Sequence, residues 1–438
     1  MATETLGDNT IVIDLGLDRG EPETYASPTR STVPDWFRPL IVAALALIAL
    51  TASGPPPAPA LSALLSLRVG PADSYTVTDA GQLLVQTDGT LTSYDLSDGS
   101  AQWQTGTPAP TYRFRAGSGV ALLRPWAIGP GQPRTTAVDL STGAIRWSRT
   151  GTVMTIPGSP TLLAVSAVRT ISTAGRRIQG PVEAVDPATG RRLWQVTVPV
   201  TAVLMGVPGP DRSPRMLLVH DNRTMAVHDL TTGRLLASAP LPPADYGPDN
   251  PAVSGGLIVL RHSATWGTEI SAYDPVTLAL RWRRPAGGAY DPAACGALTC
   301  LAGPDGVQAV DPANGAIRWF QPGWSGLEQR GDLLLAYASP NGISEPVGIV
   351  DPATGRVLVD LHGWRPLGSP AGGDQVLVTR VVEPGARSIV AVARPGEPQP
   401  RLIADLPAGT GDCQAVPNRL ICRSTSGELI VWAYREKG

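Results

Sequence analysis

Residues 184–194 read AVDPATGRRLW, and this stretch decides the fold of the 438-residue chain. An apolar strand ends at Asp186, whose carboxylate can accept a hydrogen bond from a backbone N–H two or three residues later and so start a turn. Pro187 has the φ that the second position of a type I turn requires. Gly190 supplies a left-handed residue that lets a short hairpin close. The chain then extends again, so the stretch predicts strand, tight hairpin and strand, with Trp194 just past the turn.

The same pattern returns along the chain at spacings of 37 to 47 residues. The aspartates that follow an apolar strand are Asp95, Asp139, Asp186, Asp229, Asp274, Asp311 and Asp351. The glycines four residues later are Gly99, Gly143, Gly190, Gly233, Gly315 and Gly355. The tryptophans eight residues after the aspartate are Trp103, Trp147, Trp194, Trp282 and Trp319. Leu278 replaces the glycine in one copy, and Ala237 and Val359 replace the tryptophan in two. A degenerate copy has Arg394 at the aspartate position, and a last partial copy spans 429–435.

A repeat of this length with four short strands predicts an all-β fold, a β-propeller of four-stranded blades. Segments 162–168 and 257–260 are apolar on both faces, as blades packed face to face require. Nine aspartate positions align, ending at Arg435, but we expect eight blades, with seven or nine as alternatives and 340–411 as the region where the count fails. Residues 64–69 (LLSLRV) are predicted to be an outer strand that completes the C-terminal copy and closes the ring.

Three further copies carry a family resemblance: AVDLSTGAIRW at 137–147, AVDPANGAIRW at 309–319 and, without its glycine, AYDPVTLALRW at 272–282. Together with 184–194 they resemble the repeat of the pyrroloquinoline-quinone (PQQ) type β-propellers, the quinoprotein alcohol dehydrogenase-like family. The resemblance covers about residues 65–435 and implies that each tryptophan docks between neighbouring blades. Because the motif is a packing device, it predicts the fold and says little about activity.

The composition excludes some classes of protein. Only 16% of the residues are charged and the net charge is −2, so nothing in the charge indicates a nucleic-acid partner or an acidic disordered chain. Lys437 is the only lysine among 35 basic residues, a bias typical of a GC-rich genome such as an actinobacterial one.

The N-terminal region predicts a membrane attachment. Residues 1–38 are acidic and are expected to form a disordered cytoplasmic tail. Residues 39–53 carry no charge and follow Trp36, Phe37 and Arg38, the flank of a helix that leaves the cytoplasm. We expect 39–60 to be a single-pass signal-anchor and linker in the plasma membrane, with a propeller at 61–438 outside. The alternative is a secreted protein with a cleaved signal peptide, because 15 apolar residues are short of the roughly 20 of a usual span.

The four cysteines fall into two close pairs, Cys295 with Cys300 and Cys413 with Cys422. Each pair surrounds turn residues, so each can lie on adjacent strands of one hairpin at disulfide distance. Two disulfides and an oxidising compartment are the prediction. The alternative is one zinc site, although the spacing is not that of a zinc motif and the pairs lie in different blades.

No catalytic residue is predicted. The family's enzymes bind the quinone and calcium in the central funnel beside an adjacent pair of bonded cysteines, and this chain has no Cys-Cys pair. We therefore predict neither cofactor nor metal, with PQQ as the alternative. A reduced quinone site would draw on the tryptophans outside the repeat, which are Trp126, Trp266, Trp324 and Trp364.

Other candidate sites are weak. The histidines His220, His228, His262 and His362 are too scattered to predict a metal cluster, although His220 and His228 can face each other across a hairpin that turns at 221–223. Residues 245–250 are acidic but lack the alternating oxygen ligands of a calcium loop.

Three functions remain open at this point. The first is a membrane-anchored, extracytoplasmic binding or scaffold propeller whose loops hold an unknown protein or small-molecule ligand. The second is a PQQ-dependent dehydrogenase-like enzyme with a reduced site, and the third is a sensor that signals to the N-terminal tail.

Overall fold

The computed structural model describes residues 36–52, 60–70, 73–107, 111–125, 134–156, 158–165, 168–171, 176–210, 213–244, 249–264, 267–287, 291–368, 373–382 and 387–435. The chain separates into two compact units, residues 1–58 and 59–438. Each unit is described by itself.

The first unit contains one helix, α1, which spans Phe37–Ala52. It covers most of the predicted apolar segment, and its side chains at Leu40, Ile41, Val42 and Leu45 are exposed. In the part of the chain that the structure describes, no helix combines the length and the apolar character that crossing a membrane requires. The predicted tail up to residue 35 lies outside the described residues.

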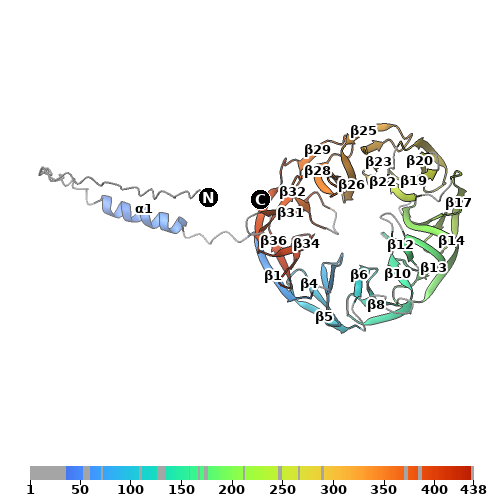
Figure 1. Cartoon of the computed structure of the whole chain (residues 1–438). Helices are drawn as coiled ribbons and strands as arrows, with labels where there is room; N and C mark the ends of the chain where they lie inside the picture. The colour runs from blue at the N-terminus through green and yellow to red at the C-terminus, as the bar shows by residue number, and fades with distance from the viewer. Residues whose placement is uncertain are drawn as a thin grey trace, which may run out of the picture. The chain divides into compact units, whose positions relative to one another are not determined.

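The second unit is a ring of antiparallel β-sheets around a central axis (Figure 1). Over the described residues there are eight sheets, seven with four strands and one with eight. One four-stranded sheet contains β2 (Ser74–Val77), β3 (Gln82–Thr87), β4 (Thr90–Asp95) and β5 (Ala101–Gly106), and the next contains β6 (Thr111–Gly117), β7 (Val120–Pro125), β8 (Arg134–Asp139) and β9 (Ile145–Thr150). A third contains β18 (Asp249–Ser254), β19 (Leu257–Ala264), β20 (Gly267–Tyr273) and β21 (Leu280–Pro285). A fourth contains β22 (Asp291–Cys295), β23 (Leu298–Gly303), β24 (Gly306–Val310) and β25 (Ile317–Pro322). The other three are β26 (Trp324–Arg330), β27 (Leu333–Ala338), β28 (Glu345–Val350) and β29 (Val357–Asp360); β30 (Arg365–Pro366), β31 (Val376–Val382), β32 (Arg387–Ala393) and β33 (Arg401–Leu406); and β1 (Leu61–Arg68), β36 (Glu428–Tyr434), β35 (Arg419–Ser424) and β34 (Thr410–Val416).

The eight-stranded sheet contains two repeat units that share one long strand. Its strands are β10 (Thr152–Thr155), β11 (Leu162–Val165), β12 (Val168–Ile171), β13 (Arg176–Val185), β14 (Arg192–Pro208), β15 (Pro214–His220), β16 (Thr224–Asp229) and β17 (Leu235–Pro240). The first half of β14 pairs with β13, and its second half, from Ala202 to Pro208, pairs with β15. β14 is thus the outermost strand of one unit and the innermost strand of the next.

This shared strand explains the ambiguous blade count. The expected number, eight, is the number of separate sheets, whereas the number of four-stranded repeat units in the described chain is nine. The expectation that 340–411 breaks the repeat is wrong, because β30 to β33 form an ordinary four-stranded sheet there. The irregular region is β14, where no turn separates one unit from the next.

The ring closes as predicted, through a sheet built from both ends of the propeller. β1 pairs antiparallel with β36 and forms the outer edge of the sheet that contains β34 and β35. The strand begins at Leu61, three residues before the predicted start. Closure in this way satisfies the outer backbone edge of β36, which would otherwise stay open to other chains.

The aspartate turns have the predicted geometry. In the repeat at 186, Oδ1 of Asp186 accepts hydrogen bonds from the backbone N–H groups of Ala188 at 2.7 Å and Thr189 at 3.3 Å. Gly190 has a φ of +69° and donates its N–H to the Asp186 carbonyl. In three copies the second carboxylate oxygen, Oδ2, also pairs with an arginine seven residues later; these pairs are Asp139 with Arg146, Asp274 with Arg281 and Asp311 with Arg318.

Each repeat tryptophan docks on the next unit, as the family resemblance implied. The indole N–H of Trp147 donates to the Pro187 carbonyl at 2.9 Å, one residue past the next aspartate, and a Cβ added to Gly190 would lie 2.6 Å from Trp147. The indole therefore lies directly on the glycine of the neighbouring turn. The other tryptophan–carbonyl pairs are Trp103 with Leu140, Trp194 with Leu230, Trp282 with Pro312 and Trp319 with Pro352, at 2.8–3.1 Å.

At one junction a small residue stands at the tryptophan position and a large residue stands at the glycine position. Ala237 stands where the other units have tryptophan, and Leu278 stands where the next unit should have glycine. Leu278 is 3% exposed, has a φ of +56°, and packs in one apolar cluster against Ala237. A leucine reaching back from the second unit thus fills the space that an indole fills elsewhere.

Both predicted disulfides are present. Cys295–Cys300 connects β22 to β23, and Cys413–Cys422 connects β34 to β35, where the two residues are direct cross-strand partners. Each bridge lies in the first hairpin of its sheet. The zinc alternative is therefore wrong for these four cysteines.

Candidate functional site

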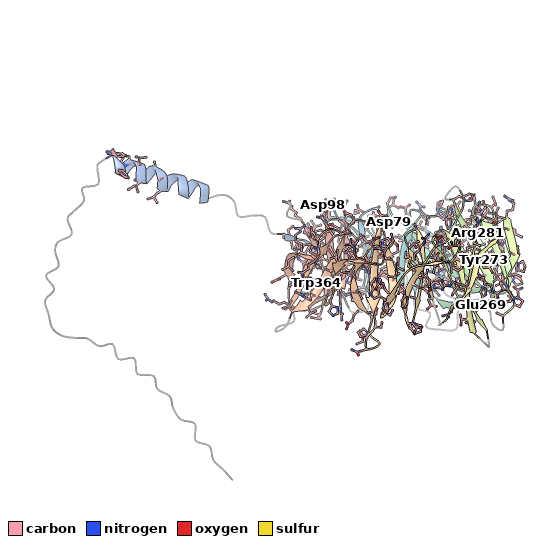
Figure 2. All side chains as sticks on the ribbon, turned by 90° about the horizontal axis from the view of Figure 1, so that it is seen from above. Asp79, Asp98, Glu269, Tyr273, Arg281 and Trp364 are labelled. Carbon is pink, nitrogen blue, oxygen red and sulfur yellow. A yellow bond between two sulfur atoms is a disulfide. The ribbon has the colours of Figure 1, made fainter. Side chains whose placement is uncertain are left out.

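Both faces of the propeller carry connections of different lengths. The seven aspartate turns join the third and fourth strands of their units and are short and alike. The same face also holds the connections between first and second strands, which range from two residues between β22 and β23 to nine between β30 and β31. On the opposite face, connections range from none, within β14, to eight residues between β7 and β8 and between β17 and β18. Figure 2 shows Asp79 and Asp98 on one edge of the ring and Glu269 on the other. Both faces thus hold variable loops, which are the segments that commonly carry recognition residues.

The central side of three adjacent sheets carries a cavity of about 690 Å³. Its walls come from β18, β22 and β26, and the side chains that line it are mostly small and apolar, such as Ala252 and Ala293. The only charged side chain among the described lining residues is Asp291, which pairs with Arg261 at 2.9 Å. A bound quinone with calcium needs an aromatic surface and several free oxygen ligands. These residues do not fit that group.

The tryptophans proposed for a reduced quinone site are structural where they are described. Trp324 is 8% exposed and packs edge-on against Trp319, with ring centroids 6.2 Å apart. Trp364 is 6% exposed and lies under the guanidinium of Arg380. Trp126 and Trp266 lie outside the described residues.

Three of the four histidines, His220, His228 and His262, are buried, and His362 is exposed. His220 and His228 lie on the β15–β16 hairpin, which turns at 221–223 as predicted, but they are not cross-strand partners, since His220 pairs with Thr224. Burial lowers the pKa of His220, and the neighbouring His228 lowers it further. His262 lies between Arg223 and Ser271. No cluster of metal ligands occurs among the described residues, and of the calcium candidate at 245–250, residues 245–248 lie outside them.

A polar cluster near the inner strands was not predicted. The Tyr337 hydroxyl donates to Glu328 at 2.5 Å, and Glu328 also accepts from Arg330 at 2.8 Å. Burial and the Glu328 carboxylate raise the pKa of Tyr337, so this hydroxyl stays protonated and donates to the carboxylate. Since Arg330 also reaches the Leu367 carbonyl on the next sheet, the cluster joins two units. These contacts therefore have a structural role in holding the two units together.

Two cavities flank one turn at the place where the ring closes. The β2–β3 turn, residues 78–81, lines both a cavity of about 570 Å³ and one of about 410 Å³. The larger is bounded on its far side by the β34–β35 turn, including Arg419, and the smaller by the β6–β7 turn. Asp79 and Ala80 belong to both linings and are exposed. We call this region, residues 78–81 with the two cavities, the seam cleft.

Arg419 holds the closing junction together. Its Nε donates to the carbonyl of Leu96, one of its terminal nitrogens donates to Ser97 at 3.0 Å, and the other donates to Asn418 at 2.8 Å. Leu96 follows Asp95 directly, so its carbonyl is the one that an indole N–H engages at the tryptophan junctions. Arg419 and Asp79 gave no signal in the sequence, because neither belongs to the repeat motif.

Comparisons with known proteins agree with this fold. The family model described as outer membrane protein assembly factor BamB matches residues 63–157 and 179–360. Among solved structures, BamB from Moraxella catarrhalis is 16% identical with a TM-score of 0.41, and covers 85% of this chain and 100% of its own. A eukaryotic initiation factor is 12% identical with a TM-score of 0.52, over 82% of this chain and 94% of its own.

A europium-containing methanol dehydrogenase is also similar, at 13% identity and a TM-score of 0.38, over 63% of this chain and 73% of its own. These identities show the fold alone. No curated protein matches the chain. Since the matched residues make up more than half of the sequence and carry the indole-docked repeat, this chain belongs to the PQQ-type propeller family described as outer membrane protein assembly factor BamB.

Proposed function

We propose that this protein is a non-catalytic scaffold, anchored in the plasma membrane by the segment around α1, whose propeller lies outside the cell and binds a protein partner. The observation that carries the proposal is the contrast between a rigid ring and variable connections. Five indoles each seal one repeat unit to the next, while the connections between strands vary from no residue within β14 to nine between β30 and β31. A rigid body with variable loops is suited to recognition.

Three further observations support it. The family's name refers to assembly of outer membrane proteins, which is a scaffold role. The disulfides Cys295–Cys300 and Cys413–Cys422 persist in oxidising compartments. The aromatic and basic residues Trp36-Phe37-Arg38 stand at the start of α1, which carries no other charge, and this is the order expected for an N-terminus that stays in the cytoplasm.

Partner capture tests the binding role. The full chain, tagged at its C-terminus, would be cross-linked in its own cells and compared with a variant in which residues 243–248, between β17 and β18, are replaced by glycine and serine. A matched control is Gly256→Asn in the β18–β19 turn on the aspartate face, where φ is +74° and an added Cβ would meet no atom within 4 Å. We expect a stoichiometric protein partner that the first variant loses and the control keeps. Recovery of the same partner by all three chains, or of none, would contradict this proposal.

Two measurements separate the alternatives. Titration of the full chain with PQQ and calcium is expected to give no stoichiometric binding and no dye-linked oxidation of alcohols or sugars, and turnover above background would support an enzyme instead. For location, a cysteine placed at Ser97 is expected to react with a membrane-impermeant maleimide on intact cells. Labelling only after lysis would place the propeller inside.

A further inference from the structure

We propose that the seam cleft is a docking site for a basic, extended protein segment, with the Asp79 carboxylate as the anchor for a lysine or arginine side chain. The proposal rests on the scaffold function above and adds to it a place on the molecule and the chemistry of the partner. It concerns the face that carries the aspartate turns.

The turn that carries Asp79 is held rigid. The N–H of Thr78 donates to the Gln82 carbonyl at 2.9 Å, the Gln82 N–H returns to the Thr78 hydroxyl at 3.1 Å, and the Gly81 N–H donates to the Thr78 carbonyl at 3.0 Å. The Gly81 carbonyl in turn accepts from the N–H of Leu96, which fixes the next turn beside it. Asp79 therefore projects from a preorganised support, and binding does not have to order the loop.

The support extends over three sheets. On one side Arg419 reaches the Leu96 and Ser97 carbonyls, and on the other the Gln82 side chain donates to the Leu140 carbonyl at 3.0 Å. The cavities of about 570 Å³ and 410 Å³ lie on either side of this same turn. An extended segment laid across the turn can thus place one side chain in each cavity. Figure 2 shows Asp79 and Asp98 on the same exposed edge.

The charge of the cleft favours a cation. The charged side chains that line the two cavities are Asp79, Asp95 and Arg419. Arg419 directs its donors to three backbone carbonyls, so its role is structural. Asp79 is exposed and forms no ion pair with any residue that the structure describes, whereas Asp95 accepts from Ser97 and Gln102. A carboxylate at the centre of a concave site attracts a basic side chain, with a strength that salt reduces.

The test uses a displayed library of short random peptides selected on the immobilised full chain. We expect the selected peptides to be rich in arginine and lysine, and the best of them, synthesised with blocked ends, to bind the full chain more weakly as salt rises. Asp79→Asn should weaken that binding about threefold to fivefold, the range of a partly exposed ion pair. Ala80→Trp, which places a bulky indole on the turn between the two cavities, should abolish it.

Matched controls exist on the same face. Asp332 lies on the β26–β27 turn, the equivalent turn of another unit, and Ala297 lies on the β22–β23 turn; both are exposed. Asp332→Asn and Ala297→Trp should leave binding unchanged. Peptides without basic residues, equal loss in test and control variants, or no selected peptide would each overturn the proposal. Because the partner capture described above uses variants on the opposite face, it can still succeed when this test fails.

Discussion

Two of the junctions in the ring solve the same packing problem with different residues. At a tryptophan junction, one side chain does two things: the ring of Trp147 covers Gly190, and its N–H satisfies the Pro187 carbonyl. At the closing seam, among the residues that the structure describes, other side chains take these two roles. There Leu64 of β1 lies over Gly99, and Arg419 satisfies the equivalent carbonyl of Leu96.

At these two junctions the same two roles are filled by different residues. Each has an apolar cover over the turn and a donor for the carbonyl after the aspartate, since a buried carbonyl without a partner is costly. One indole supplies both within a single repeat. The seam divides them between two segments more than 300 residues apart, so we expect it to be the weaker junction.

The largest effect is expected from removing an indole. Trp147 is 9% exposed, and Trp147→Ala should lower the free energy of unfolding by about 3–5 kcal/mol, the range for a buried aromatic side chain. Urea unfolding of the full chain followed by tryptophan fluorescence measures this. Trp147→Phe keeps the cover but loses the N–H, and should cost less. An alanine variant as stable as the phenylalanine variant would show that the ring does not seal the junction.

The next effect tests the glycine side of the junction. Gly143 has a φ of +75°, and a Cβ there would lie 2.5 Å from Trp103. Gly119 has nearly the same φ, +74°, but no atom within 4 Å of the added Cβ. Gly119→Ala should therefore cost only the left-handed backbone term of about 1 kcal/mol, while Gly143→Ala adds about 1–3 kcal/mol of overpacking.

Thermal unfolding of both glycine variants gives the difference directly. In the background of Trp103→Ala the extra cost at Gly143 should vanish, since the clashing ring is gone. If the two alanine variants are equally stable in the native background, the indole does not require glycine.

Substitution at the closing seam should lower the free energy of unfolding less than substitution at a tryptophan junction. Arg419→Met keeps an apolar stem but removes the donors to Leu96 and Ser97, and should cost about 1–2 kcal/mol, the lower part of the range for charged hydrogen bonds because Arg419 is partly exposed. Hydrogen exchange should show faster local opening of β1 and β36 than of β8 and β9 at a tryptophan junction. Uniform acceleration over all sheets would mean that the seam has no separate stability.

These junctions also show what the sequence could predict. The aspartate turns, the docked indoles and both disulfides were predictable because each depends on residues close together in one hairpin or on a motif repeated in the next. β14 was not, since a continuous strand across two units leaves no turn signal between 198 and 202. The role of Arg419 was not, because its carbonyl partner is distant in the chain and backbone groups carry no sequence signature.

The candidate site residues also differ in how far the sequence alone could predict them. Trp324 and Trp364 could be named from the sequence as tryptophans outside the repeat, but only the structure shows that they are buried in the apolar clusters between sheets. Asp79 lies in an ordinary-looking turn, and its position between two cavities arises from three sheets that meet there. The surroundings of such a side chain depend on how the sheets meet when the ring closes, and the sequence of a single repeat does not contain that information.

The smallest effect concerns the turn aspartates and depends on pH. Backbone N–H donation from Thr277, followed by the Arg281 guanidinium, lowers the pKa of Asp274 to about 2. A group whose pKa is lower in the folded than in the unfolded chain stabilises the fold above its unfolded pKa and loses that contribution as pH falls through the folded pKa. Asp274→Asn should therefore cost about 1 kcal/mol or less at neutral pH, because the turn is at the surface and solvent screens the ion pair.

The difference between wild type and Asp274→Asn should then shrink as pH falls from about 4 to about 2, which urea unfolding across that range measures. Asp186 is the matched position without an arginine seven residues later, since Leu193 stands there. Asp186→Asn should show the same sign with a smaller amplitude, because its pKa is lowered mainly by the backbone N–H groups of Ala188 and Thr189, without a hydrogen bond from an arginine. A pH-independent cost at both positions would mean that the carboxylates act by shape and not by charge. The turns that begin every outer strand would then be indifferent to ionisation, and the arginines opposite Asp139, Asp274 and Asp311 would contribute packing alone.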